Sequence, residues 1–317
     1  MKSKDNVTSS PTVMSNLTEL IPDPLRKEFC PNPKTITRST PENEITVVTA
    51  YFNIGSFRKG HDTKFDTKLY KSWMKTFQYL HNPLIVYVDD QEVAEIFEKL
   101  RKDLKSMTKI IMLDRTKLWS FGLNRRITNI FSNASYPKFH PNTVVPEYSC
   151  AQHAKYECVQ RAIQVDYFSS HHVHYSWLDI GYFREIVSCA YNFKLVLPDN
   201  FNKNRISFTQ VNNAVPAISI SDIFLKNQVW VGGGMILASK DVFENFIHHY
   251  MEAVEIFLEK SLMNSDQQVI YAIYSEVGRQ FFNPNVELQL YGSYNGWFYL
   301  GFLCHRSFNT PTLSPSV

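Results

Sequence analysis

The chain has 317 residues, of which 33 are basic and 30 acidic, so its formal net charge is +3. A charge this close to neutral gives no electrostatic argument for nucleic acid as a partner. No stretch of the sequence reaches the roughly 18 apolar residues of a transmembrane helix, and the N-terminus lacks the apolar region of a signal peptide. The sequence as given predicts a cytoplasmic protein, whereas the Golgi or ER lumen stays open if an anchor has been removed.

Hydrophobic residues make up 44% of the chain and aromatic residues 14%, which is enough to fill a sizeable core. The rings either fill this core or, in part, line a cleft in which a sugar or a base stacks. The cysteines are odd in number and have no C-x-x-C spacing, which argues against a zinc site and a dense disulfide framework. We expect buried thiols, with a single disulfide as the open alternative, among Cys30, Cys150, Cys158, Cys189 and Cys304.

Residues 1–43 are rich in Ser, Thr, Pro and Asn, and this composition predicts a flexible leader. One globular domain is expected over residues 44–307, followed by a C-terminal tail over 308–317. In the first half of the domain, apolar runs bounded by turn residues predict strands, and apolar residues at helical spacing predict helices between them. The predicted strands cover 45–52, 84–88 and 110–113, and the predicted helices cover 65–80 and 93–100.

Strands that alternate with helices in this way form parallel sheets with right-handed crossovers. In the second half of the domain, a helix over 151–167 leads into a strand that ends at Asp179. The later elements are strands near 193–197, 206–208, 229–237 and 286–290, and helices over 240–260 and 265–280. The whole pattern predicts an α/β fold with a mixed, mostly parallel sheet flanked by helices in a single domain.

Four carboxylates stand directly after predicted strands: Asp89, Asp90, Asp114 and Asp179. The carboxyl ends of parallel strands meet at one edge of the sheet, which is where open α/β sheets bind ligands. An aspartate in such a position can instead cap the following helix, and this alternative is the stronger one for Asp90 and Asp114. Asp179 is the leading candidate for a metal-binding or catalytic carboxylate, because Gly181 and aromatic residues follow it instead of a helical pattern.

Three consecutive glycines, Gly232, Gly233 and Gly234, come directly after Trp230 and Val231. One interpretation is a backbone that passes close to a ligand with its N–H groups facing it. The other is a bulge or a tight bend. The sequence contains neither a G-x-G-x-x-G nor a Walker pattern, so it gives no support to a dinucleotide site or a P-loop.

Three further side chains are candidates for a site. Asp266 follows Ser265 at the start of a predicted helix, and it either caps this helix or accepts a proton or a hydrogen bond from a substrate. Lys155, on the helix before Asp179, either reaches a phosphate or belongs to a solvated face. An isolated histidine is usually not a ligand, but His305 beside a distant carboxylate would complete an oxygen-plus-imidazole site for a divalent ion.

The order of these features resembles that of the GT-A nucleotide-sugar glycosyltransferases, and more closely that of the HtrL/YibB-like family of glycosyltransferase-like proteins. The likeness covers residues 45–306, which is most of the chain. It is carried by the segments 47–52, 177–181, 230–234 and 265–268.

This resemblance implies a GT-A-like, Rossmann-type sheet in which a D-x-D motif holds Mn²⁺ or Mg²⁺ against the donor diphosphate. Asp179 takes the place of the first acid, but Gly181 replaces the second. His305 resembles the C-terminal histidine that completes the metal site in many such enzymes, and Asp266 falls where the acceptor-side base often lies. The residues expected to face the donor sugar or nucleotide are Gly232, Gly233, Gly234, Thr49, Ala50, Tyr51 and Asp89.

The implied function is metal-assisted transfer of a sugar from a nucleotide-sugar donor to a glycan, lipid-glycan or protein acceptor. Two alternatives stay open. One is a catalytically inactive module that binds a glycan or a protein, which Gly181 in place of a second carboxylate would suit. The other is a different α/β nucleotide-binding enzyme, such as a nucleotidyltransferase.

Overall fold

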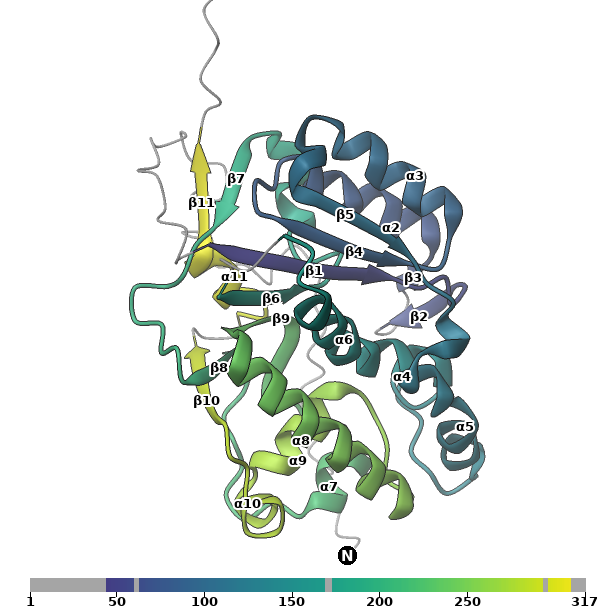
Figure 1. The fold of residues 1–317 in the computed structure, drawn as a ribbon. Coiled ribbons are helices and arrows are strands. Elements are labelled where there is room, and N and C mark those ends of the chain that lie inside the picture. Colours follow the sequence, from purple (N-terminus) through teal and green to yellow (C-terminus); the bar gives the residue numbers. More distant parts are fainter. Residues whose placement is uncertain (1–43, 60–62, 169–172, 293–295, 309–317) are drawn as a thin grey trace, which may run out of the picture.

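The computed structural model describes residues 44–59, 63–168, 173–292 and 296–308, with a seven-stranded sheet at its centre (Figure 1). The strands are β1 (Ile45–Tyr51), β4 (Leu84–Val88), β5 (Thr108–Met112), β6 (His174–Leu178), β8 (Arg205–Gln210), β9 (Val231–Ser239) and β10 (Glu287–Gly292). Their order in the sheet is β10-β8-β9-β6-β1-β4-β5. Neighbours are parallel except at β9, which runs antiparallel to both β6 and β8. The predicted α/β fold with a mixed, mostly parallel sheet is confirmed.

The strands alternate apolar side chains between two cores, one on each face of the sheet. Along β4, Leu84, Val86 and Val88 belong to one core, and Ile85 and Tyr87 belong to the other. Each of these side chains is buried, so neither face of the strand meets water. This is why the segment is a continuous apolar run, as expected for a parallel strand covered on both sides.

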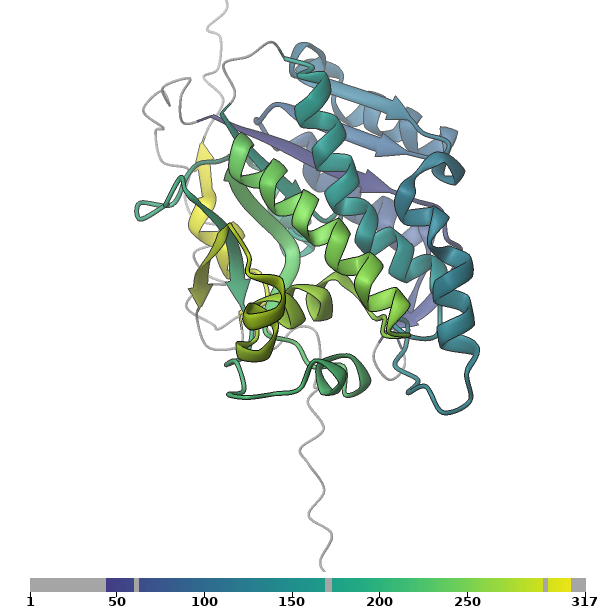
Figure 2. The same ribbon diagram turned by 60° about the horizontal axis from the view of Figure 1, so that its bottom comes forward.

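Helices cover both faces. On one face the two long helices α6 (Pro146–Val165) and α8 (Lys240–Glu259) lie side by side across the sheet (Figure 2). The shorter α9 (Asp266–Tyr274) packs against α8 and β9. The other core contains residues of α2 (Thr67–Met74), α3 (Gln91–Leu100) and α11 (Tyr299–Cys304).

Two small sheets lie outside the central one. β2 (Phe57–Lys59) pairs with β3 (Thr63–Phe65), and β7 (Asn192–Leu195) pairs with β11 (His305–Phe308). The β2–β3 hairpin was not predicted, because strands of three residues are too short for an alternating pattern to show. The remaining helices are α4 (Trp119–Gly122), α5 (Asn124–Ser132), α7 (Ile220–Leu225) and α10 (Glu276–Phe282), with 3₁₀ helices at Lys75–Gln78, Lys102–Met107, Arg115–Lys117 and Arg184–Cys189.

Three predicted helices differ from the observed ones. The helix expected over 151–167 is α6, which begins at Pro146 and ends at Val165. The helix expected over 65–80 begins at Thr67, because Asp66 caps it, and it continues beyond Met74 as a 3₁₀ helix. The helix expected over 265–280 is broken at Ser275, whose extended backbone ends α9 and begins α10. The predicted leader and the tail beyond Phe308 lie outside the described residues.

Three of the four described cysteines, Cys150, Cys158 and Cys304, are free and buried, as predicted. Cys189 is disulfide-bonded, so the alternative of a single disulfide, which the sequence left open, is confirmed for this cysteine. Within the described ranges, no helix combines the length and the apolar character that crossing a membrane requires.

His153 is completely buried in α6, where it faces α8. Its Nδ1 lies 2.7 Å from Tyr250 Oη, and its Nε2 lies 3.4 Å from Ser149 Oγ. Burial and, to a lesser degree, the ammonium of Lys155 lower the pKa of His153 to about 3. The imidazole is therefore neutral in the folded protein at pH 7.

We predict that His153 makes the fold acid-sensitive between its unfolded pKa of about 6.5 and its folded pKa of about 3. In this window the unfolded chain binds more protons, so the free energy of unfolding falls with falling pH, by up to about 1.4 kcal/mol per pH unit. Denaturant unfolding between pH 7 and pH 4 should show a shallower pH dependence for His153→Gln than for the wild type. His248→Gln, at a histidine that is 77% exposed, is the control. An unchanged slope in His153→Gln would contradict this assignment.

Candidate functional site

Asp179 stands at the carboxyl end of β6, directly after Leu178. Its backbone N–H donates to the carbonyl of Gly234 in β9 at 2.8 Å. Because β9 runs antiparallel to β6, the first residues of β9 lie beside the last residues of β6. The three glycines therefore lie beside Asp179, although the two segments are far apart in the sequence.

The glycines interrupt the pairing of β9 with β8. Phe208 of β8 pairs with Ile236, but the next residue, Thr209, pairs with Gly232. The intervening part of β9, which includes Gly233, is released from the ladder with β8. The bulge that the sequence allowed is present, and it leaves the carbonyl of Gly233 available to a side chain.

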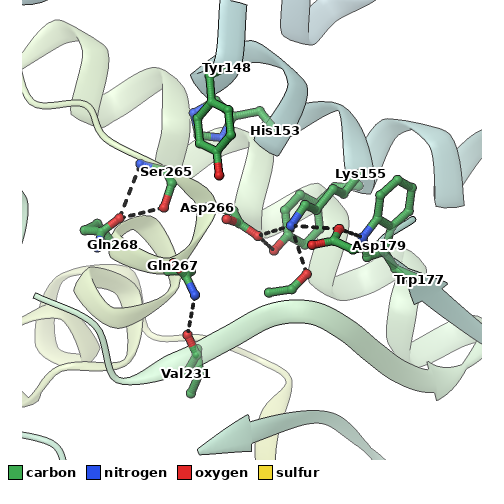
Figure 3. A network of polar contacts seen from close by, with 12 residues as sticks. Tyr148, His153, Lys155, Trp177, Asp179, Val231, Ser265, Asp266, Gln267 and Gln268 are labelled. Carbon is green, nitrogen blue, oxygen red and sulfur yellow. Dashed lines mark hydrogen bonds and ion pairs between the residues drawn. The ribbon is translucent and has the colours of Figure 1, made fainter. Parts of the chain in front are cut away.

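The ammonium of Lys155 contacts both this carbonyl and two carboxylates (Figure 3). Its Nζ donates to the carbonyl of Gly233 at 2.9 Å, and it lies 3.3 Å from Asp179 Oδ1 and 3.3 Å from Asp266 Oδ2. The side chain comes from α6 and is only 4% exposed, so the alternative of a solvated face is wrong for Lys155. The structure thus brings Asp179, Lys155, Asp266 and Gly233 together.

Asp266 is the first residue of α9, but Ser265 is the residue that caps this helix. The hydroxyl and the backbone N–H of Ser265 both donate to Oε1 of Gln268, as in a capping box. The carboxylate of Asp266 is therefore left to face Lys155, and it also accepts a hydrogen bond from Tyr156 Oη at 3.3 Å. The positive end of the helix dipole favours a negative charge at this position.

These buried charges determine each other's pKa. Burial raises the pKa of Asp266 above the usual carboxyl range, and Lys155 opposes that shift. Burial alone would lower the pKa of Lys155, but Asp179 and Asp266 together raise it above its ordinary value. Lys155 therefore stays protonated at neutral pH, since its loss of a proton would leave two carboxylates facing each other.

Asp179 is the open member of this cluster. Its side chain is 40% exposed, whereas that of Asp266 is 2% exposed. Asp179 Oδ1 accepts a hydrogen bond from Trp177 Nε1 at 2.7 Å and faces Lys155, which together fix the orientation of the carboxylate. A carboxylate held on one side and open on the other can contact a ligand without a rearrangement of the protein.

The position two residues after Asp179 has no room for a second carboxylate. A Cβ on Gly181 would lie 2.7 Å from Cε3 of Trp73. The guanidinium of Arg184 lies 5.6 Å from the centre of a Trp73 ring and donates to the carbonyl of Gly181 at 3.1 Å. The packing around Gly181 therefore excludes the second carboxylate of a D-x-D motif at this position.

His305 lies on β11, outside the central sheet. Its ring stacks on Phe193 with 4.8 Å between ring centres, and the ring of Phe183 is 5.9 Å away. Burial lowers the pKa of His305 to about 4, so this imidazole is neutral at pH 7. Among the residues that the structure describes, no group of three or more His, Cys, Asp or Glu side chains is arranged to hold a metal ion. Metal binding by Asp179 and His305 stays a prediction.

Thr49, Tyr51 and Asp89 belong to the same edge of the sheet, but each already has a partner within the protein. The hydroxyl of Thr49 is buried and donates to the carbonyl of Leu178 at 2.6 Å. The hydroxyl of Tyr51 donates to a threonine of α2 at 2.8 Å. Asp89 is paired with Arg115 at 2.9 Å. Thr49 and Tyr51 are buried, so a nucleotide in this place would reach their side chains only if neighbouring groups moved.

The other strand-end positions have structural roles. Ala50 packs against the core on the α6 side of the sheet. Asp90 accepts a hydrogen bond from the N–H of Val93 and caps α3, and Asp114 accepts one from the N–H of Thr116. The capping alternative for these two aspartates is confirmed.

The sequence interpretation missed two cations near Asp179. Lys59 ends the short strand β2, and Arg184 begins a 3₁₀ helix shortly after Gly181. Desolvation lowers the pKa of both side chains, and the carboxylate of Asp179 opposes this shift in each, together with Glu185 in the case of Arg184. Proximity to Asp179 in the sequence was the only available signal for Arg184, and Lys59 had none, because the hairpin that carries it was not predicted.

The fold and the site define an α/β protein whose charged side chains gather at the carboxyl edge of a mostly parallel sheet. Residues 43–300 match the model of a family described as a bacterial protein of unknown function (HtrL_YibB), and the chain belongs to this family. It is 24% identical over 282 residues to Protein HtrL of Escherichia coli (strain K12), with 84% of this chain and 94% of that protein covered. The predicted resemblance to the HtrL/YibB-like family is confirmed.

Among solved structures, the chain is similar to that of the glycosyltransferase GlyE in Streptococcus pneumoniae TIGR4. The TM-score is 0.34 and the sequence identity is 11%. The likeness covers 78% of this chain and 45% of that one, so this chain matches less than half the length of GlyE.

We predict that the ion pair between Lys155 and Asp266 is required for folding stability. Lys155→Met should lower the free energy of unfolding by about 3–5 kcal/mol, because it leaves a buried carboxylate without its counter-charge. Adding Asp266→Asn should recover part of this loss. Denaturant unfolding of the two single variants and the double variant measures the coupling. Lys226→Met, in the exposed pair with Asp222, is the control and should change stability by less than about 0.5 kcal/mol. Additive effects of the two site substitutions would show that the pair is not coupled.

A second prediction concerns Gly233. A Cβ at this position would overlap Asp266 Oδ2 and lie 3.2 Å from Lys155 Nζ. Gly233→Ala should therefore destabilise the fold by about 1–3 kcal/mol, as expected for overpacking. Gly122→Ala is the matched control, since its Cβ would meet no atom within 4 Å. Equal melting temperatures of Gly233→Ala and the wild type would mean that β9 is not held against the ion pair.

Proposed function

We propose that the chain is a glycosyltransferase that moves a sugar from a nucleotide-sugar donor to a hydroxyl of a glycan, lipid-glycan or protein acceptor. The observation that supports this most directly is Asp179, an open carboxylate held by a buried lysine at the end of a core strand. Open α/β sheets bind their ligands at this edge. An aromatic cluster lies close by, and its members Tyr70 and Trp73 are only partly buried, so a sugar could stack on them.

The reaction breaks the bond between C1 of the sugar and an oxygen of the donor diphosphate, and the electron pair leaves with that oxygen. C1 forms a new bond to the acceptor oxygen, and the acceptor proton passes to a base. The sugar carries positive charge in an oxocarbenium-like transition state, while negative charge grows on the leaving diphosphate. A fixed carboxylate beside the sugar and fixed cations beside the diphosphate both lower this barrier.

The two acids of the cluster suit different roles. Asp179 is exposed enough to touch the substrate, so we assign it the catalytic role beside the sugar. Asp266 is 2% exposed and already bonded to Lys155 and Tyr156, so an acceptor hydroxyl reaches it only if one of these moves. This burial favours Asp266 as a positioning residue for Lys155 over the predicted role of acceptor-side base.

The donor would lie along the carboxyl ends of β1 and β6. Its base or ribose would face the end of β1, where the residues expected to contact it are Thr49, Ala50, Tyr51 and Asp89. Its sugar would face the start of β9, where the bulge brings the glycine backbone beside Asp179. Gly232, Gly233 and Gly234 are the residues expected to face the sugar, but the space beside Gly233 and Gly234 is taken by the side chains of Asp266 and Tyr182, so only their backbone could contact it.

A divalent cation is a poor fit to the side chains at Asp179. Mg²⁺ and Mn²⁺ prefer several oxygen ligands. Oδ1 of Asp179 already faces the Lys155 ammonium, and the packing of Trp73 leaves no room for a second acid at residue 181. His305 is packed among aromatic rings on a separate small sheet. The side chains present at Asp179 therefore give no support to a metal-assisted step.

Asp179→Asn keeps the shape of the side chain and removes its charge, so it tests the catalytic assignment. We expect the rate of nucleoside diphosphate release from an accepted nucleotide sugar to fall at least about 100-fold, within the range for a lost catalytic carboxylate. The donor is found first by screening UDP-, GDP-, CDP- and ADP-sugars by mass spectrometry. Asp114→Asn, at an exposed capping position, is the control. Full activity in Asp179→Asn would contradict the catalytic role of Asp179. Nucleotide binding without turnover of any donor would favour a catalytically inactive binding module.

A further inference from the structure

The donor diphosphate carries negative charge that must be compensated where it binds and where it leaves. In the cluster at Asp179, Lys155 cannot do this, because its ammonium already lies within 3.3 Å of two carboxylates. Two other cations, Arg184 and Lys59, share the site with Asp179 but belong to neither of these ion pairs.

Arg184 is held beside the place where a second carboxylate would stand. Its guanidinium lies 4.7 Å from the ring centre of Phe298 and 5.6 Å from a ring centre of Trp73, and it donates to the carbonyl of Gly181 at 3.1 Å. Within the described residues, its ion pair is with Glu185 and is long, at 3.8 Å. The planar guanidinium is thus fixed in position by rings and by a backbone carbonyl, which leaves its remaining N–H groups for an anion.

Lys59 reaches the site from the β2–β3 hairpin. Its Nζ donates to Tyr148 Oη at 3.4 Å, and it lies 5.7 Å and 5.9 Å from the ring centres of Phe65 and Tyr148. No carboxylate of the described residues forms an ion pair with it. Lys59 is exposed to solvent as a residue, whereas its ammonium lies beside two aromatic rings, and desolvation by these surroundings lowers its pKa to about 8.

Among the described residues, neither cation has a close carboxylate partner: Arg184 lies 3.8 Å from Glu185, and Lys59 belongs to no ion pair. Desolvation lowers the pKa of Arg184, and Glu185, Tyr70 and Asp179 offset only part of this effect. A cation without a close counter-ion gains most when an anion arrives. Phosphate oxygens suit both, because arginine binds them through its planar fork and lysine through a point charge.

We propose that Arg184 and Lys59 bind the diphosphate of the nucleotide-sugar donor, and that donor binding requires no divalent cation. This inference rests on the proposed function and adds to it the residues that compensate the charge of the leaving group. Trp73 has two effects in this arrangement: it fills the space that a second carboxylate at residue 181 would need, and it supports the guanidinium that replaces a metal ion.

The test is calorimetric titration of the full chain with UDP, GDP, CDP and ADP, first in EDTA and then in Mn²⁺. We expect at least one of these nucleotides to bind in EDTA with an affinity within a few-fold of that in Mn²⁺. Lys59→Gln and Arg184→Gln should each weaken this binding about tenfold, as expected for the loss of one charge-assisted hydrogen bond. Lys59→Arg should keep the affinity within a few-fold. Arg58→Gln, which removes the exposed neighbouring cation of β2, should leave it unchanged.

The outcomes separate this inference from the proposed function. Binding that requires Mn²⁺ and is unaffected by either substitution overturns the role of the two cations but leaves the glycosyltransferase proposal standing. Failure of all four nucleotides to bind in either buffer overturns both. Thermal unfolding checks that each variant is folded. If Arg184→Gln unfolds because it loses its ring contacts, Lys59→Gln decides the matter alone: wild-type affinity in this variant overturns the inference.

Discussion

The site depends on one buried ammonium. Lys155 is removed from water, which is costly for an ion, and the cost is offset because two carboxylates and a backbone carbonyl surround its Nζ. These partners come from β6, β9 and α9, so one side chain of α6 fixes three elements relative to one another. Such an interaction tolerates little change, since removal of any one charge leaves another uncompensated. The same rigidity is what holds Asp179 in a single orientation while its outer side faces solvent.

The packing around this ion pair explains features that look unrelated in the sequence. The antiparallel direction of β9 brings its glycines to Asp179, and the bulge against β8 frees the carbonyl that Lys155 binds. Trp73 closes the space beside Gly181 and supports Arg184. Arg184 is held at Gly181, two residues after the open carboxylate of Asp179, and Lys59 interacts electrostatically with the same carboxylate. This balance of charge suits a substrate with a cationic centre next to an anionic leaving group, such as a nucleotide sugar in its transition state.

Much of the fold could be predicted because the central strands are uninterrupted apolar runs, as in β4, and because Asp179 and the glycines stand at strand ends. The contact of Lys155 with Asp179 and Asp266 could not, because it depends on the direction of β9 and on how α6 crosses the sheet, and neither leaves a local pattern. Asp266 was predicted as a site residue that accepts the acceptor proton. Its burial, which the sequence does not show, favours the role of holding Lys155 in position. The resemblance to GT-A enzymes implied that His305 completes a metal site with Asp179, and this stays a prediction. The ring contacts of His305 follow from the pairing of β11 with β7, which no local pattern in the sequence indicates.

The most direct measurement is a crystal structure of the chain with UDP or GDP, grown with EDTA and again with Mn²⁺. We predict the diphosphate within hydrogen-bonding reach, about 3 Å, of the guanidinium of Arg184 and the ammonium of Lys59 in both crystals, with its terminal phosphate directed toward Asp179. A nucleotide bound away from the carboxyl end of β6 would contradict the assignment of this edge as the active site. A diphosphate held only through Mn²⁺, with Arg184 and Lys59 turned away from it, would contradict the role of the two cations.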